Sequence, residues 1–130
     1  GRNKDLHALI KSIKQLGCRV SLFMDPDLDQ IKRAADLDAD RIELYTGPFA
    51  DAFIRNAQDN RIFEQHCKAA ELANKLGLGV NAGHDLNLQN LTVYKTLPYL
   101  QEVSIGHAFT IDSLDYGLET TVQKYRTALS

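Results

Sequence analysis

The sequence predicts an α/β protein built from parallel (β/α) units. Short apolar runs alternate along the chain with longer segments in which apolar residues recur every three or four positions. These spacings are typical of buried strands and amphipathic helices, respectively. No two-residue turn such as Asn-Gly joins neighbouring apolar runs, so antiparallel hairpins are not expected. Strands joined by helices instead pair in parallel through right-handed crossovers.

The first part of the chain predicts a helix, a strand and a second helix. The opening helix ends at Gly17, a residue favoured just beyond a helix C-terminus. Its apolar positions are Leu6, Leu9, Ile10, Ile13 and Leu16. The apolar run Cys18–Met24 predicts the first strand. Asp25 before Pro26 predicts the next helix start, because a carboxylate caps free amides and proline suits the first turn. The inner face of this helix consists of Ile31, Ala34, Ala35 and Leu37.

The rest of the chain predicts three more strands, each followed by a helix. The strands are Arg41–Tyr45, Leu78–Asn81 and Glu102–Ile105. Gly47-Pro48 interrupts the pattern, and a polar loop through Asn56 is expected before a long helix that ends at Gly77. A shorter helix stops near Pro98. The last helix has the clearest amphipathic spacing, with Ile111, Leu114, Leu118, Val122, Tyr125 and Leu129.

Residues 1–130 are therefore expected to form a single domain of four βα units preceded by a helix. Two architectures fit this order, a small doubly wound sheet or half of an eight-stranded barrel. A complete (β/α)8 barrel takes roughly 250 residues, so four units in 130 residues amount to about half of one.

Composition narrows the classes of partner. The apolar fraction of 44% and charged fraction of 25% are those of a soluble globular protein. A formal net charge of -2 argues against nucleic acid or an acidic membrane surface as a partner. The sequence contains neither a bilayer-spanning apolar stretch nor a signal-peptide pattern, and it starts at Gly1, which indicates a processed or truncated start. Cys18 and Cys67 lack CxxC spacing and predict buried thiols in a reducing cytoplasm.

Two Gly-His turns are the most informative motifs. Gly83-His84 and Gly106-His107 each follow a predicted strand. The carboxyl ends of parallel strands meet at one edge, which brings Asp25, Glu43, His84 and His107 toward a common ligand. Glycines and helix starts also present unobstructed backbone amides, a common means of holding phosphate. The expected ligand class is an oxygen-rich, phosphate-bearing small molecule.

Each of these residues also has a structural interpretation that involves no ligand. Asp25 is best explained as a helix cap, and Glu43 is either ion-paired or functional. His84 is able to bond its own loop, and His66 is expected on a helix surface. The strand-end carboxylates and histidines are also potential ligands of a divalent metal, but they lack HxH or HExxH spacing. No predicted strand ends in lysine, which argues against a Schiff base. A metal-free acid–base site is the favoured hypothesis.

Four segments in this order resemble pyridoxine 5′-phosphate synthase. They are Val20–Asp25, Ile42–Gly47, Val80–His84 and Ile105–Ala108. The resemblance runs from about Val20 to the last helix and corresponds to the second half of that family's (β/α)8 barrel.

Membership would imply ring closure between 3-amino-2-oxopropyl phosphate and 1-deoxy-D-xylulose 5-phosphate, giving pyridoxine 5′-phosphate, phosphate and water without an organic cofactor. The resemblance implies that His84 is the proton donor and that Glu43 stabilises charge in the transition state. It also implies that Asp85, Gly106 and His107 contact the amino-oxopropyl phosphate. Some members have glycine in place of Asp85, which favours a backbone contact there.

The first half of the family's barrel carries further catalytic and substrate-binding residues, and none of that half is present. The isolated chain is therefore expected to be inactive. Because members tend to form homo-oligomers and an open sheet edge invites pairing, self-association is expected. The alternatives are a phosphate-binding half-barrel without catalysis, a half-barrel completed by another chain, and an unrelated phosphosugar isomerase or epimerase.

Overall fold

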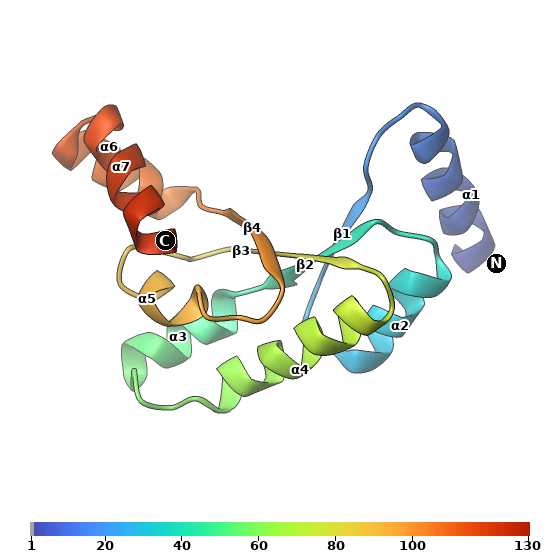
Figure 1. Cartoon of the computed structure of the whole chain (residues 1–130), viewed down its shortest axis with the longest axis horizontal. Coiled ribbons are helices and arrows are strands. Elements are labelled where there is room, and N and C mark those ends of the chain that lie inside the picture. Colours follow the sequence, from blue (N-terminus) through green and yellow to red (C-terminus); the bar gives the residue numbers. More distant parts are fainter. Residues whose placement is uncertain (1) are drawn as a thin grey trace.

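The computed structural model describes residues 2–130 and alternates helices with strands along the chain (Figure 1). The elements are α1 (Arg2–Gln15), β1 (Ser21–Met24), α2 (Leu28–Asp36), β2 (Arg41–Tyr45), α3 (Gly47–Arg55), α4 (Arg61–Lys75), β3 (Gly79–Gly83), α5 (Leu91–Tyr94), β4 (Leu100–Ser104), α6 (His107–Tyr116) and α7 (Leu118–Leu129). The predicted alternation is confirmed.

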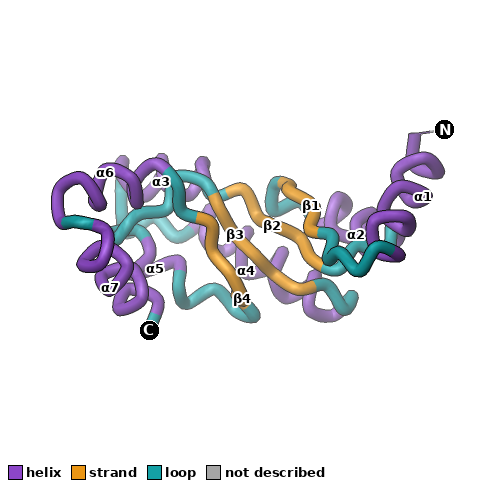
Figure 2. Tube along the Cα trace, turned by 90° about the horizontal axis from the view of Figure 1, so that it is seen from above, coloured by secondary structure: helices purple, strands orange, loops and turns teal. Residues whose placement is uncertain are grey.

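The four strands form one parallel sheet in the order β1-β2-β3-β4. Because parallel crossovers turn in the same right-handed sense, a sequential strand order places the connecting helices on one face. Figures 1 and 2 show α2, α3, α4 and α5 on the same side of the sheet. A doubly wound sheet carries helices on both faces. Of the two architectures open from the sequence, the structure therefore has the arrangement of a barrel segment.

The buried core lies between the sheet and these helices. Side chains alternate along β2, and Ile42 and Leu44 are fully buried on the helix-covered face. Other members of the core are Ile31, Ala34, Ala69, Ala70, Ala73, Val80, Ala82, Leu91 and Tyr94. Each large aliphatic side chain buried in this way contributes about 1.5–3 kcal/mol, so this face of the sheet stabilises the fold.

The other face of the sheet is polar. Arg41 Nη1 donates to Asn81 Oδ1 at 2.9 Å and pairs with Glu102 Oε1 at 3.1 Å. Asn81 Nδ2 and Arg19 Nη2 also donate to the Glu102 carboxylate, at 3.1 Å. On β1, Phe23 remains 57% exposed. In a closed barrel this face becomes the interior, where charged groups need partners.

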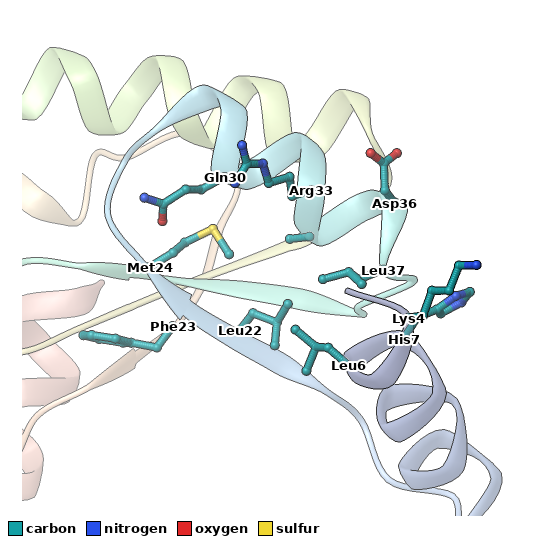
Figure 3. A pocket seen from close by; sticks show the side chains of 11 residues that line it. Lys4, Leu6, His7, Leu22, Phe23, Met24, Gln30, Arg33, Asp36 and Leu37 are labelled. Carbon is teal, nitrogen blue, oxygen red and sulfur yellow. The ribbon is translucent and has the colours of Figure 1, made fainter. Parts of the chain in front are cut away.

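A groove follows the outer strand β1, between α1 and α2 (Figure 3). Leu6, Leu22, Met24 and Leu37 give it an apolar lining. Within the described residues β1 pairs only with β2, so its second edge keeps unpaired backbone groups. Such an edge is a template for a further strand.

The polar loop predicted through Asn56 is wrong over most of its length. Helix α3 occupies Gly47–Arg55, and the loop begins only at Asn56. Pro48 lies in the first turn of α3. Its fixed φ suits the start of a helix, so β2 is followed by a helix and not by a loop. Phe49 and Ala50 then bury against the core, which favours the helix.

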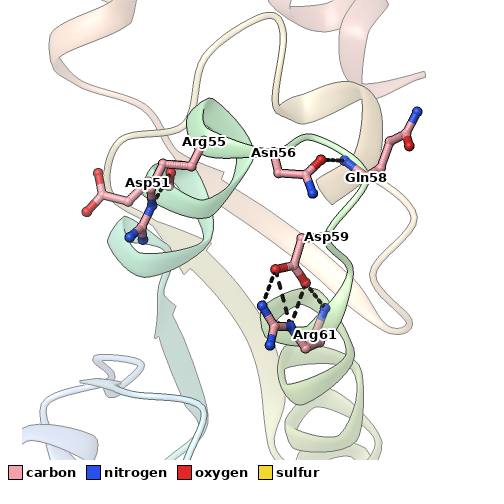
Figure 4. Close-up of polar contacts among 6 residues, drawn as sticks. All are labelled: Asp51, Arg55, Asn56, Gln58, Asp59 and Arg61. Atoms are coloured by element: carbon pink, nitrogen blue, oxygen red, sulfur yellow. Dashed lines mark hydrogen bonds and ion pairs between the residues drawn. The ribbon is translucent and has the colours of Figure 1, made fainter.

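Side chains hold the short connection from α3 to α4 (Figure 4). Asn56 Oδ1 accepts a hydrogen bond from the Gln58 amide at 3.1 Å. Asp59 Oδ1 accepts from the Arg61 amide at 3.1 Å, and Arg61 Nη2 lies 2.6 Å from Asp59 Oδ2. The side-chain hydrogen bonds from Arg61 lower the pKa of Asp59 to about 2. The carboxylate thus remains ionised at the start of α4.

The single amphipathic helix predicted at the end of the chain is two helices. Gly117, with φ of +80° and ψ of 154°, separates α6 from α7. This extended left-handed backbone favours glycine and cannot continue a helix. Leu114 and Leu118 are 83% and 64% exposed on either side of the break, whereas Tyr125 is buried. The apolar spacing continues through Gly117 although the helix does not.

Three smaller predictions also need correction. The cap of α2 is Asp27, whose Oδ1 accepts from the Asp29 and Gln30 amides, rather than Asp25. Cys18 is exposed because β1 begins three residues later than predicted. The third wrong prediction placed His66 at the surface.

His66 is fully buried, because α4 packs beneath aromatic side chains of neighbouring helices. Its Nδ1 lies 2.8 Å from the Tyr94 hydroxyl. Burial lowers the pKa of His66 to about 4, so its ring is neutral at pH 7.

Candidate functional site

One pocket at the carboxyl ends of β2, β3 and β4 gathers all five residues predicted for the site. They are Glu43, His84, Asp85, Gly106 and His107. Ser104 and Ile105 complete the lining of a volume of about 360 Å³. Asp25 lines a different pocket beside His66 and is not part of the site. Parallel pairing thus brings together groups that lie more than sixty residues apart in the chain.

Glu43 lies on the polar face of β2, next to Gly83 of the neighbouring strand. A methyl group at Gly83 would collide with Glu43 Oε1, so the missing side chain makes room for this carboxylate. The paired carboxylate on this face belongs to Glu102, and Glu43 has no charged partner within the described residues. Of the two interpretations open from the sequence, the ion-paired one is therefore not met within these residues, and a functional Glu43 stays a prediction.

His84 sits in an uncommon backbone conformation. Its φ is +94° and that of Asp85 is +57°, a region that costs about 1–3 kcal/mol for a residue other than glycine. The imidazole is 59% exposed, with its Nδ1 3.1 Å from Asp85 Oδ2. The ring also meets the edge of Tyr45 at a centroid distance of 5.3 Å. Because Nδ1 is bonded to Asp85, Nε2 is the ring nitrogen that remains open to a ligand.

Two buried residues that sequence reasoning missed hold this turn. Thr46 donates through its amide to the Gly83 carbonyl at 3.0 Å and through Oγ1 to the His84 carbonyl. Asn90 Nδ2 donates to the Asp85 carbonyl at 3.0 Å. Thr46 directly follows a strand and Asn90 belongs to a polar turn, so both are expected to make local backbone bonds. Their contact with the His84 turn depends on the fold.

The second Gly-His turn is simpler. α6 begins at His107, and Gly106 precedes it with φ of -113° and no side-chain cap. The amides of the first turn therefore have no partner from an N-cap side chain, and the helix dipole adds partial positive charge. This end of the pocket is suited to an anion such as phosphate.

Within residues 2–130, no three His, Cys, Asp or Glu side chains gather as potential metal ligands. None of the helices in this range has both the length and the apolar character needed to cross a bilayer.

The fold and the pocket together define a parallel (β/α) half-barrel with histidine and carboxylate side chains and a helix start at the carboxyl ends of its strands. Residues 1–130 match the family described as "Pyridoxal phosphate biosynthesis protein PdxJ", and the chain belongs to this family.

Curated relatives named pyridoxine 5′-phosphate synthase are similar to the chain. The one from Leptospira biflexa is 52% identical over 126 residues, covering 96% of this chain and 48% of the relative. Those from Porphyromonas gingivalis and Brucella anthropi are 48% and 45% identical, covering 99% of this chain and 54% and 53% of the relatives.

The chain spans about half the length of the curated relatives it matches. The resemblance found in the sequence is confirmed, as is the fold class of an α/β half-barrel. The roles of the five site residues remain predictions.

Proposed function

We propose that the protein to which this chain contributes is a pyridoxine 5′-phosphate synthase, which condenses 3-amino-2-oxopropyl phosphate with 1-deoxy-D-xylulose 5-phosphate. The observation that carries the proposal is the single pocket shared by the five predicted site residues. Family membership and the relatives' names support the same reaction.

In this proposal the first turn performs proton transfer. His84 in its imidazolium form donates the Nε2 proton, while Asp85 accepts a hydrogen bond from Nδ1–H, so the neutral ring that results keeps its proton on Nδ1. Glu43, on the neighbouring strand, stabilises positive charge that develops in the transition state. Because the Asp85 carboxylate is engaged with His84, Asp85 contacts the substrate through its backbone.

The second turn binds the phosphate of the amino-oxopropyl substrate. Backbone amides at the start of α6 donate to the phosphate oxygens, and His107 adds a side chain beside them. No organic cofactor takes part in the proposed reaction, and its partners are small phosphorylated molecules rather than nucleic acid or membranes.

The proposal also covers the oligomeric state of the protein and its place in the cell. The groove along β1 and the unpaired strand edge favour association with further chains, so we propose a homo-oligomer. Two free thiols fit a reducing cytoplasm.

Complementation between halves tests the function. The chain is mixed with the amino-terminal half of the Leptospira biflexa relative, and pyridoxine 5′-phosphate is measured by chromatography after both substrates are added. We expect product from the mixture but from neither half alone. Product from the 130-residue chain alone would overturn the predicted need for a second half. No product from a mixture that sedimentation shows to be assembled would contradict the proposed reaction.

A further inference from the structure

Three consecutive carbonyl groups at the first Gly-His turn each accept a hydrogen bond from a residue outside the turn. Thr46 donates to the carbonyls of Gly83 and His84, through its amide and its Oγ1 respectively. Asn90 Nδ2 donates to the carbonyl of Asp85. The backbone of the turn is therefore bonded at every residue from 83 to 85.

Both donor side chains are themselves fixed. Thr46 is fully buried and Asn90 is 1% exposed. Asn90 Oδ1 accepts from the Asn87 amide at 2.8 Å, and Asn87 Oδ1 accepts from the Asn90 amide at 2.9 Å. Neither donor is free to follow a moving turn, so together they act as a rigid clamp on it.

The imidazole of His84 needs such a clamp. More than half of this side chain is exposed, and its only polar contact within the described residues is with its neighbour Asp85. Two successive residues at positive φ persist only where the surrounding structure imposes that conformation. Thr46 also follows Glu43 by three residues, so its bonds tie the strand that carries Glu43 to the turn that carries His84.

We propose that Thr46 and Asn90 are positioning residues that hold His84 at a set place relative to Glu43. The two residues touch no reacting atom in this proposal and act through the backbone of residues 83–85. The effect of this placement on proton transfer by His84 rests on the proposed function. The restraint on the backbone of the turn does not.

Backbone order parameters from NMR relaxation test the clamp in the 130-residue chain. Thr46→Val keeps the shape of the side chain and removes the hydroxyl donor, while Thr46→Ser retains it. We expect the order parameter of the His84 amide to fall from about 0.85 to below about 0.6 in Thr46→Val and to recover in Thr46→Ser. Asn90→Ala is expected to have the same effect at Asp85, and it carries the test if Thr46→Val does not fold.

A purely structural role predicts another outcome. It would lower the unfolding temperature of Thr46→Val while leaving the His84 order parameter unchanged, and this result would overturn the proposal. Titration with inorganic phosphate, followed at the amides of Gly106 and His107, tests the proposed function separately. We expect the phosphate affinity of Thr46→Val to stay within about twofold of wild type, because the Thr46 hydrogen bonds go to Gly83 and His84 and not to Gly106 or His107. Absence of phosphate binding in the wild type would count against the proposed site without touching the clamp.

Discussion

The two Gly-His turns share a dipeptide and differ in construction. At the first turn His84 has φ of +94°, and buried donors bond the carbonyls on both sides of it. At the second turn Gly106 has φ of -113°, and α6 starts at once without a side-chain cap. In the proposed function the first arrangement fixes an imidazole, whereas the second presents backbone amides to an anion. The different roles proposed for the two turns therefore rest on the hydrogen bonds around each dipeptide rather than on the dipeptide itself.

Substitution of the two histidines gives the largest expected contrast. In the complemented two-half enzyme, His84→Gln removes the proton donor, and kcat is expected to fall by about 10²–10⁴. His107→Gln removes one contact to a charged ligand, and KM is expected to rise by about tenfold to a hundredfold with a smaller change in kcat. Steady-state kinetics separate the two effects. Equal losses of kcat in both variants would mean that the turns do not differ in role.

His66 provides the next contrast, because its side chain is buried whereas that of His84 is exposed. Its folded-state pKa of about 4 lies below its unfolded value of 6.5, so the unfolded chain binds the extra proton between these values. The stabilising contribution of neutral His66 is fully present above pH 6.5. As the pH falls toward 4, the unfolding free energy is expected to decrease by about 3 kcal/mol.

Urea unfolding between pH 4 and pH 7 checks this dependence. His66→Gln keeps a hydrogen-bonding side chain without the titration, and its unfolding free energy is expected to vary much less over the same range. His84→Gln is the matched control, because it makes the same substitution at an exposed ring. A wild-type slope in His66→Gln would show that another group controls acid unfolding.

A pair of threonines sharpens the comparison of the turns themselves. The buried Thr46 bonds the part-buried His84 carbonyl, and Thr110 Oγ1 bonds the Gly106 carbonyl at 3.2 Å on the surface. Thr46→Val leaves the His84 carbonyl with one partner fewer, which is expected to lower the unfolding free energy by about 1 kcal/mol. Thr110→Val is expected to change it by less than about 0.5 kcal/mol, since water replaces the lost donor. Equal losses in urea unfolding would contradict a clamp confined to the first turn.

The sequence predicts the parts of the molecule that depend on hydrophobic spacing. Ile42 and Leu44 alternate with polar residues on β2 because one face of the strand meets the helices. The same rule locates the strand ends, and the parallel register then brings Glu43, His84 and His107 to one pocket. The parallel sheet and the meeting of these side chains follow from local patterns plus one topological rule, whereas the half-barrel is one of two architectures that the patterns alone leave open.

What the sequence cannot predict depends on neighbours that only the fold supplies. His66 has a polar side chain of a type that is often exposed, but it lies four residues before Ala70 and seven before Ala73 on the buried face of α4, where Phe49 and Tyr94 pack against it. Pro48 is compatible with a loop or a helix start, and burial of Phe49 decides between them. Thr46 reaches His84 across 38 residues, a contact that no local pattern contains.

The two glycines of the motifs give the smallest and most local contrast. A methyl group at Gly83 meets the Glu43 carboxylate and, at 3.0 Å, the Ser104 Cβ, whereas one at Gly106 meets open space. Gly83→Ala is expected to displace the flexible end of Glu43 at a stability cost of about 1 kcal/mol, the lower end of the range for overpacking. Gly106→Ala, at an ordinary φ, is expected to stay within about 0.5 kcal/mol.

The matching measurements are urea unfolding and the 13C chemical shift of the Glu43 carboxyl group. Gly83→Ala is expected to move the Glu43 signal, and Gly106→Ala to leave it in place, because only the first glycine touches the carboxylate. An unmoved Glu43 signal in a folded Gly83→Ala variant would remove the steric reason for glycine at the first turn. The difference between the turns would then rest on the clamp alone.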